Sequence, residues 1–179
     1  MNLLKYLPLL IIPVLLVNCR NSISGKGADL YADSILEMQT KSIVQLDSFF
    51  QSLYYPEYPV DEFYRKALQS NSDFNSGMED VNIFKQNAGL YQAGKNTCST
   101  IDRILKTEGT GLLALYPLTY SAGGSLYQHR MDSIIKASIA QVTQQQIVFD
   151  SVLTAFLNEY GFDVIKDTTF ITRTEASEK

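Results

Sequence analysis

The chain of 179 residues is poor in the residues on which metal and redox chemistry depend: it has no tryptophan, one histidine and two cysteines. Two cysteines are too few for a disulfide-rich scaffold or a four-cysteine zinc site, and one histidine excludes most multi-histidine metal centres. Basic residues (15) are fewer than acidic ones (19), which gives a net charge of -4. This balance argues against nucleic acid as a partner, because nucleic-acid-binding domains carry a basic face.

Recognisable catalytic motifs are also missing from the sequence. Neither Gly109-Thr110-Gly111 nor Gly123-Gly124 is followed by the Lys-Ser/Thr ending of a phosphate-binding loop. His129 follows Leu126 at the place where the di-iron motif Glu-x-x-His requires a glutamate, so we expect a surface histidine. Cys98 occupies an apolar helical position, which predicts a buried thiol, since a nucleophilic cysteine needs a neighbouring base. The sequence predicts no metal centre, no cofactor and no enzyme activity.

The first twenty residues have the order of a secretory signal. A single positive residue, Lys5, precedes an apolar run from Tyr6 to Val17, which ends at Asn18-Cys19. The run is shorter than the ~20 apolar residues that a membrane-spanning helix needs. We therefore expect residues 1–18 to be a cleaved signal peptide. Residues 19–27 are polar and contain Gly and Ser, which predicts a flexible tether.

Leu16-Val17-Asn18-Cys19 resembles the lipobox of bacterial lipoproteins, in which an aliphatic residue, a small residue and Gly, Ala or Ser precede the cysteine. The resemblance implies cleavage before Cys19, attachment of diacylglycerol to its sulfur and acylation of the new N-terminus. Asn18 departs from the usual small residue, although relaxed lipoboxes accept it. Arg20 replaces the Asp that often retains lipoproteins in the inner membrane, which favours an outer-membrane anchor facing the periplasm and leaves surface exposure open. The alternative is an ordinary signal peptide cut near Cys19.

From Ala28 onward, apolar residues recur at helical spacing, which predicts an all-α protein. The clearest seam lies in the last helix, where apolar positions follow alternating steps of three and four residues. Short breaks between the helices favour antiparallel neighbours, and hence an up-down bundle over residues 28–162. Residues 163–179 are expected to form a tail, which either contains a short strand, packs along the bundle or is disordered. Four helices are predicted, over about 28–54, 61–88, 98–115 and 125–160, and the alternative for residues 109–120 is an irregular apolar segment.

Local signals predict how these helices begin and end. Ser125 and Gln128 match a capping box at the start of the last helix, and Gly161 is a natural left-handed cap at its end. Gly89 and Gly94 predict a turn or kink around residues 88–95.

Tyrosines gather in two of the predicted turns. Exposed tyrosines suit recognition, because they offer a large contact area at low entropic cost. In an up-down bundle these two turns lie at the same end, where the rings either bind a partner or simply cap the bundle. The turn tyrosines are Tyr54, Tyr55 and Tyr58 in the first turn, and Tyr116, Tyr120 and Tyr127 around the last.

Two polar residues, Ser138 and Gln145, stand on the apolar seam of the last helix. They either fix the register of the bundle, as a buried polar layer does, or line a ligand cavity. The sequence thus predicts a lipid-anchored envelope protein that acts as a non-enzymatic binding module. Its expected partners are a membrane, through lipid on Cys19, and an unidentified protein or envelope component. The alternative is a periplasmic carrier of small ligands with a cavity inside the bundle.

Overall fold

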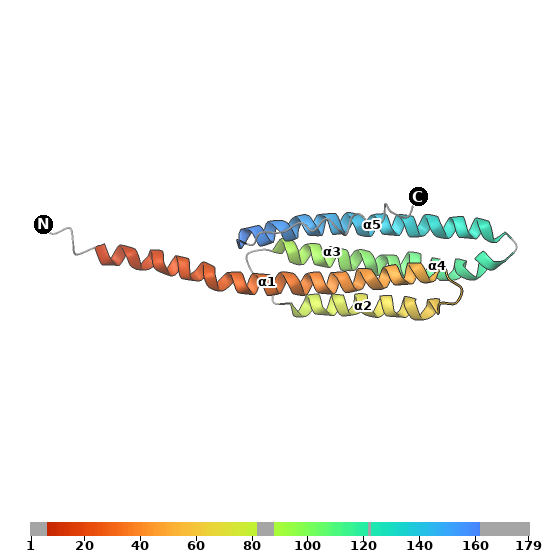
Figure 1. Cartoon of the computed structure of the whole chain (residues 1–179), viewed down its shortest axis with the longest axis horizontal. Coiled ribbons are helices and arrows are strands. Elements are labelled where there is room, and N and C mark those ends of the chain that lie inside the picture. Colours follow the sequence, from red (N-terminus) through yellow and green to blue (C-terminus); the bar gives the residue numbers. More distant parts are fainter. Residues whose placement is uncertain (1–6, 82–87, 122, 162–179) are drawn as a thin grey trace.

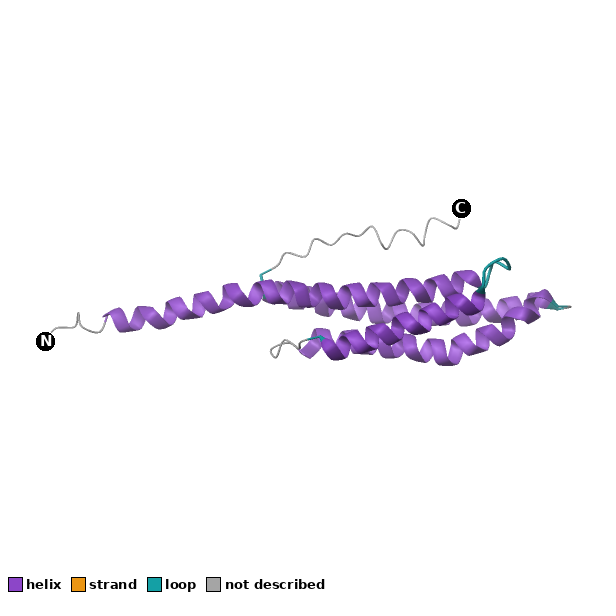
Figure 2. Cartoon of the chain, turned by 90° about the horizontal axis from the view of Figure 1, so that it is seen from below, coloured by secondary structure: helices purple, strands orange, loops and turns teal. Residues whose placement is uncertain are grey.

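The structure, a computed structural model, describes the backbone of residues 7–81, 88–121 and 123–161. Side chains are described within these ranges from residue 27 onward, except that of residue 88. Throughout the described ranges the chain forms helices joined by short turns, without a strand (Figure 1; Figure 2). The predicted all-α fold is therefore confirmed.

Four helical arms run alternately up and down to form the predicted four-helix bundle (Figure 1). The third arm is compound, because a π-helical turn, a short α-helix and a 3-10 turn continue it without a break. Along the chain, the elements are α1 (Leu7–Ser52), α2 (Val60–Asp80), α3 (Ala88–Ile104), η2 (Leu105–Gly109), α4 (Thr110–Leu115), η3 (Tyr116–Tyr120) and α5 (Gly124–Glu159).

Helix α1 ends at Ser52, two residues before the predicted end, and Pro56 and Pro59 prevent the helix from continuing. Its start differs more: α1 begins at Leu7, whereas the apolar pattern predicted a helix from residue 28. Among the side chains that the structure describes, Ala28 is the first buried one along α1. The side chains of the lipobox segment lie outside the described residues, and lipidation of Cys19 stays a prediction.

Helix α2 begins as predicted, with Asp61 and Glu62 in its first turn at the positive end of the helix dipole. It ends at Asp80, short of the predicted residue 88, and Val81 already has an extended conformation. Two acidic residues, Glu79 and Asp80, oppose the negative C-terminal end of the dipole and make this a poor place to continue a helix.

Two local predictions about glycine and capping were wrong. The turn expected at residues 88–95 does not form, because these residues belong to α3. Gly94 is instead a close-packing position: a Cβ there would lie 3.1 Å from Cγ2 of Ile35 and 3.0 Å from Cε of Met78. The capping box at Ser125 is absent. Gly123 is the N-cap instead, with a left-handed φ of 87°, which moves the start of α5 to Gly124. The predicted left-handed cap at Gly161 is confirmed, with φ 79°.

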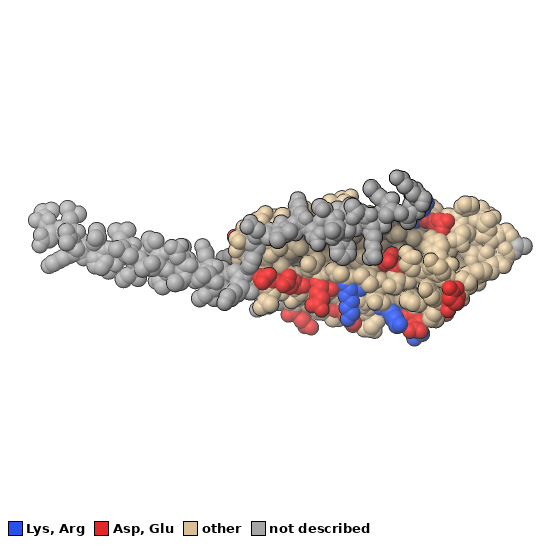
Figure 3. Space-filling model, in the orientation of Figure 1, with Lys and Arg blue, Asp and Glu red and all other residues tan. Residues whose placement is uncertain are grey.

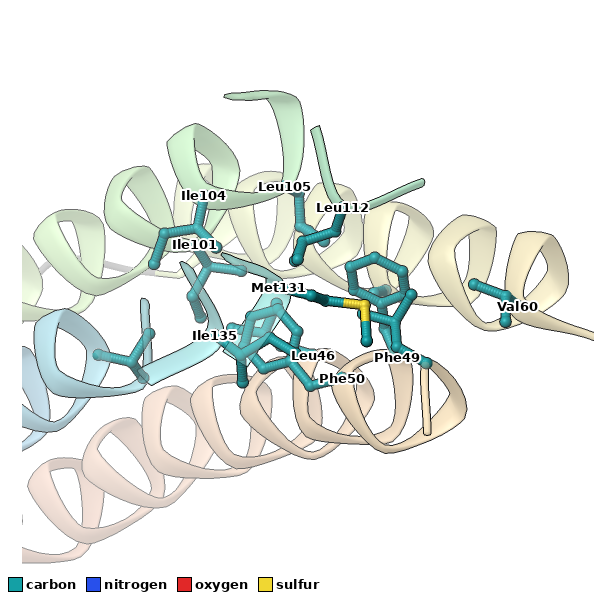
Figure 4. Close-up of a cluster of buried hydrophobic side chains, with 13 residues drawn as sticks. Leu46, Phe49, Phe50, Val60, Ile101, Ile104, Leu105, Leu112, Met131 and Ile135 are labelled. Atoms are coloured by element: carbon teal, nitrogen blue, oxygen red, sulfur yellow. The ribbon is translucent and has the colours of Figure 1, made fainter. Parts of the chain in front are cut away.

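The core consists of two apolar clusters, one toward each end of the bundle. The first gathers side chains from all four arms around Phe49 (Figure 4). Its buried members are Leu46, Phe49, Phe50, Leu53, Val60, Ala67, Ile101, Ile104, Leu105, Leu112, Met131, Ile135 and Val142. The second lies nearer to the N-terminal end of α1 and consists of Ala28, Tyr31, Ala32, Ile35, Phe74, Met78, Leu90, Ala93, Cys98, Phe149 and Phe156.

A buried polar layer separates the two clusters along α1, α2 and α3. Its members are Gln39, Ser42, Ser70, Asn71 and Thr97, each at most 6% exposed. Asn71 is its centre: its amide oxygen accepts a hydrogen bond from the Ser42 hydroxyl at 3.1 Å, and its amide nitrogen donates to the Cys98 carbonyl at 3.3 Å. One side chain therefore links three helices, because Ser42 belongs to α1 and Cys98 to α3.

Substitution Asn71→Ala is expected to lower the free energy of unfolding by about 2 kcal/mol, because it leaves two buried hydrogen-bonding groups without their partner and opens a small cavity. Urea denaturation followed by circular dichroism measures the change. Asn96→Ala, at an exposed asparagine of α3, is the matched control and should change stability by less than about 0.5 kcal/mol. Equal stabilities of the two variants would contradict the role of Asn71.

Candidate functional site

The turn between α1 and α2 (residues 53–59) and the turn between η3 and α5 (residues 121–123) lie at the same end of the bundle, as predicted (Figure 1; Figure 2). A hydrogen bond of 2.9 Å joins the two regions: the Tyr54 hydroxyl donates to Oδ1 of Asp132 in the third turn of α5. Gln128 donates to the same oxygen at 3.2 Å. The end of α1 is thereby fixed to the beginning of α5.

The tyrosine rings at this end pack against one another. The rings of Tyr55 and Tyr58 are 5.3 Å apart between centroids, and Tyr58 lies 5.8 Å from Phe63 at the start of α2. Across the end, Tyr116 and Tyr120 form an edge-to-face pair at 5.5 Å. Such aromatic pairs hold their rings in fixed orientations. A partner would therefore meet a surface that is already ordered.

Most of the predicted recognition residues are exposed. Tyr54, Tyr55, Tyr58 and Tyr120 are between 42% and 59% exposed, whereas Tyr127 is half-buried. Sequence reasoning missed two exposed leucines at the same end, Leu118 in η3 and Leu126 in the first turn of α5. The sequence could have predicted the exposure of Leu126, since this residue lies off the apolar seam of its helix. The tyrosine-rich end consists of Tyr54, Tyr55, Tyr58, Tyr116, Leu118, Tyr120 and Leu126.

A hollow of about 540 Å³ opens beside these rings, between the first turn and the third helical arm. One wall comes from the first turn and α2, including Pro56, Tyr58 and Arg65, and the other from α4 and η3, including Tyr116 and Pro117. Its volume is within the range of small-ligand and peptide sites. Rings and prolines on both sides suit an extended segment or another flat, partly apolar group.

Two phenols of the tyrosine-rich end, those of Tyr54 and Tyr116, have a raised pKa and stay neutral at physiological pH. Burial, followed by the hydrogen bond to Asp132 and the negative charge of that carboxylate, raises the pKa of Tyr54 to about 12. Burial and the neighbouring Tyr120 likewise raise the pKa of Tyr116 to about 12. On the face drawn in Figure 3, charged side chains gather along the lower edge of the bundle, while its right tip is largely uncharged. The phenols act here as hydrogen-bond donors and apolar surface.

Cys98 is 2% exposed, which confirms the predicted buried thiol. Burial is the main cause that raises its pKa to about 11, so the reactive thiolate is scarce at neutral pH. The sulfur lies 3.7 Å from the backbone oxygen of Asn71 and contributes to packing between α2 and α3. A polar groove of about 650 Å³ runs along these helices, lined by asparagines, Gln92 and two lysines that are paired with acids.

The remaining candidates from the sequence lie apart from the tyrosine-rich end. His129 is exposed, as predicted. Ser138 is fully buried between Ile135 and Val142 of the first apolar cluster, and Gln145 is half-buried further along α5. Neither lines the hollow at the tyrosine-rich end or the groove beside Cys98. Within the described ranges, no group of three or more His, Cys, Asp or Glu residues is placed to hold a metal ion.

No model of a protein family, no curated protein and no solved structure matches the chain. Among the residues that the structure describes, no helix is both long and apolar enough to span a membrane.

Substitution Tyr54→Phe tests the link between α1 and α5 through its pH dependence. The folded-state pKa of Tyr54 lies above its unfolded value of 10.0, so its contribution to stability is fully present below pH 10 and disappears as the pH rises through about 12. Wild type should therefore be more stable than Tyr54→Phe at pH 8, by about 1 kcal/mol, and the difference should shrink or reverse above pH 10.

Urea denaturation at pH 8, 10 and 11.5 measures this difference in stability. Tyr55→Phe is the control for general effects of alkaline pH, because this neighbouring exposed tyrosine makes no hydrogen bond to an acid among the described residues. A Tyr54→Phe difference that stays constant over this range would show that Asp132 does not hold the phenol in its neutral form.

Proposed function

We propose that the protein is a lipid-anchored bacterial envelope protein that binds a protein or another envelope component through its tyrosine-rich end. Cys19 would carry the lipid, after removal of residues 1–18, and the outer membrane, on its periplasmic side, is the expected location. The bundle acts in this proposal as a binding module without catalytic activity.

The observation that carries the proposal is the concentration of exposed apolar side chains at one end. In the described part of the chain, six of the twelve exposed large apolar residues belong to the tyrosine-rich end: Tyr54, Tyr55, Tyr58, Leu118, Tyr120 and Leu126. Clustered apolar and aromatic side chains are typical of interaction sites, in which tyrosine is enriched. Capping of a bundle end does not by itself require so many rings to face solvent.

The direction of α1 supports a separation between an anchor at the N-terminal end and a binding surface at the tyrosine-rich end. The tyrosine-rich end follows the C-terminal end of α1, and Cys19 lies in its N-terminal part. From Ala28, the first buried residue, to Ser52 the helix covers ~36 Å at ~1.5 Å per residue. An anchor at Cys19 would place the aromatic surface at the far end of the molecule, where a partner can reach it.

The partner should contact rings, prolines and phenol hydroxyls, because these groups line the hollow between Tyr58 and Tyr116. Acidic and basic residues at its rim, Glu62 and Arg65, allow the partner to carry polar groups of either sign. An extended polypeptide segment with apolar side chains fits this combination. The carrier alternative has no comparable support among the described residues, since Ser138 is packed into the core.

Metabolic labelling with a palmitate analogue tests the anchor. We expect labelled protein from wild-type cells and no label on Cys19→Ser, because that cysteine would be the site of diacylglycerol attachment. Cys98→Ser is the matched control and should be labelled like wild type. Equal labelling of wild type and Cys19→Ser, or a mature chain that still begins at Met1, would contradict lipidation.

Photo-crosslinking in intact cells tests the binding surface separately. Benzoylphenylalanine replaces Tyr120 in one strain and Val44, an exposed residue of α1 away from this end, in the other. We expect a discrete crosslinked product, identified by mass spectrometry, from position 120 only. Adding Tyr58→Ala should reduce its yield by about tenfold, as expected for loss of an aromatic contact at the centre of an interface. The same products from both positions would contradict a site at the tyrosine-rich end.

A further inference from the structure

From Ala137 to Asn158, the side of α5 that faces away from the bundle carries almost no charge. Between Ala137 and Asn158, a stretch of 22 residues, Asp150 is the only charged residue. Solvent-facing helix surfaces normally carry many charged side chains. This part of α5 instead exposes small and apolar residues, with Ile147 at 58% and Ile139 at 45% exposure. Its exposed members, called the neutral face of α5, are Ala137, Ile139, Ala140, Thr143, Gln144, Ile147, Val148, Asp150, Ser151, Ala155 and Asn158.

The neutral face differs from the tyrosine-rich end in chemistry and position. It has no aromatic ring, and most of its residues lie in the second half of α5, beside the second apolar cluster around Phe149. A helix side that is apolar or neutral and left uncovered calls for another element to pack on it. The described residues provide none, because α5 contacts α1, α3, α4 and η3 with its other sides.

The chain itself continues beyond α5 by 18 residues, from Phe162 to Lys179, which lie outside the described part. Gly161 precedes them in a left-handed conformation, φ 79°, which turns the chain away from the helix axis. Eighteen extended residues reach ~60 Å at ~3.4 Å each. The 36 residues of α5 are ~54 Å long at ~1.5 Å each, so the segment is long enough to return along the whole helix.

We propose that residues 162–179 fold back over α5 and that the neutral face is their docking site within the same molecule. Apolar pairs in the segment, Val164-Ile165 and Phe170-Ile171, would cover the exposed aliphatic side chains. The segment has the apolar content to do so, and it joins α5 through the turn at Gly161, so no second molecule is required.

The spacing of the residues agrees with this arrangement. Lys166 is five residues beyond Gly161, ~17 Å of extended chain at ~3.4 Å per residue. Asp150 is eleven residues before Gly161, ~17 Å along the helix at ~1.5 Å per residue. In the docked, extended segment, Lys166 would therefore stand opposite Asp150, the only charge of the neutral face. By the same count, Phe170 reaches ~31 Å and Ile139 to Ala140 lie ~32 Å from Gly161.

Chymotrypsin cleavage of the full chain after Phe170 tests the proposal, with the product 171–179 quantified by mass spectrometry. The free peptide 162–179 gives the rate for an undocked segment. We expect the full chain to be cut about tenfold more slowly than the peptide, because cleavage requires the docked segment to open first. Cleavage at the rate of the peptide would overturn the proposal. Protection that disappears on dilution would also overturn it, since it would show docking onto a second copy.

Charge reversal provides the matched variants. Asp150→Lys should speed up cleavage after Phe170 severalfold, because Lys166 would then meet a like charge, and Asp150→Lys combined with Lys166→Asp should restore slow cleavage. Glu37→Lys, at an exposed acid of α1, is the control and should leave the rate unchanged. Ile147→Asp, which removes apolar contact from the neutral face, should speed up cleavage even if the charge pair contributes little. Equal rates for wild type, Asp150→Lys and Ile147→Asp would overturn the proposal.

Discussion

The side chain of Asn71 fixes how three of the four arms of the bundle are aligned. The apolar clusters on either side of it are held by contacts without direction, which tolerate a shift of one helix by a turn. The hydrogen bonds of Asn71 to Ser42 and to the Cys98 carbonyl do not tolerate such a shift, because it would leave buried polar groups without partners. A central polar layer thus supplies the specificity that the two apolar clusters lack, as a buried polar position does in a coiled coil.

The geometry of the tyrosine-rich end depends on this alignment. With α1, α2 and α3 in register, the end of α1 stands level with the start of α5, where Tyr54 reaches Asp132. The two connecting regions then meet, and Tyr58 and Tyr116 come to line opposite walls of one hollow, although 58 residues separate them in sequence. A shift of one of these helices by one turn would displace one wall by ~5 Å relative to the other, and the hollow would no longer form.

The sequence predicted the features that depend on local chemistry. The spacing of Met131, Ile135 and Val142 predicted the buried side of α5, and the prolines after Ser52 predicted the end of α1. It could not supply contacts between distant segments, such as Tyr54 with Asp132. The sequence marked Ser138 and Gln145 as polar residues on the apolar side of α5, but it did not mark Asn71. A polar residue in an apolar pattern predicts a buried polar layer only when its hydrogen-bond partners are known. The capping box failed because a left-handed Gly123 started the helix earlier.

If Cys19 carries a lipid, as proposed, the distribution of acids would favour a bundle that presents its tyrosine-rich end away from the membrane. Asp29, Asp33 and Glu37 are exposed on α1 at the opposite end of the bundle, where Asp80 closes α2. A membrane surface rich in anionic lipids repels such a cluster over roughly a Debye length, ~8 Å at physiological salt. A lipid on Cys19 would hold the chain at the membrane while these acids disfavour contact of the bundle with it. The combination favours a bundle that stands off the surface, with its aromatic end turned toward whatever lies beyond.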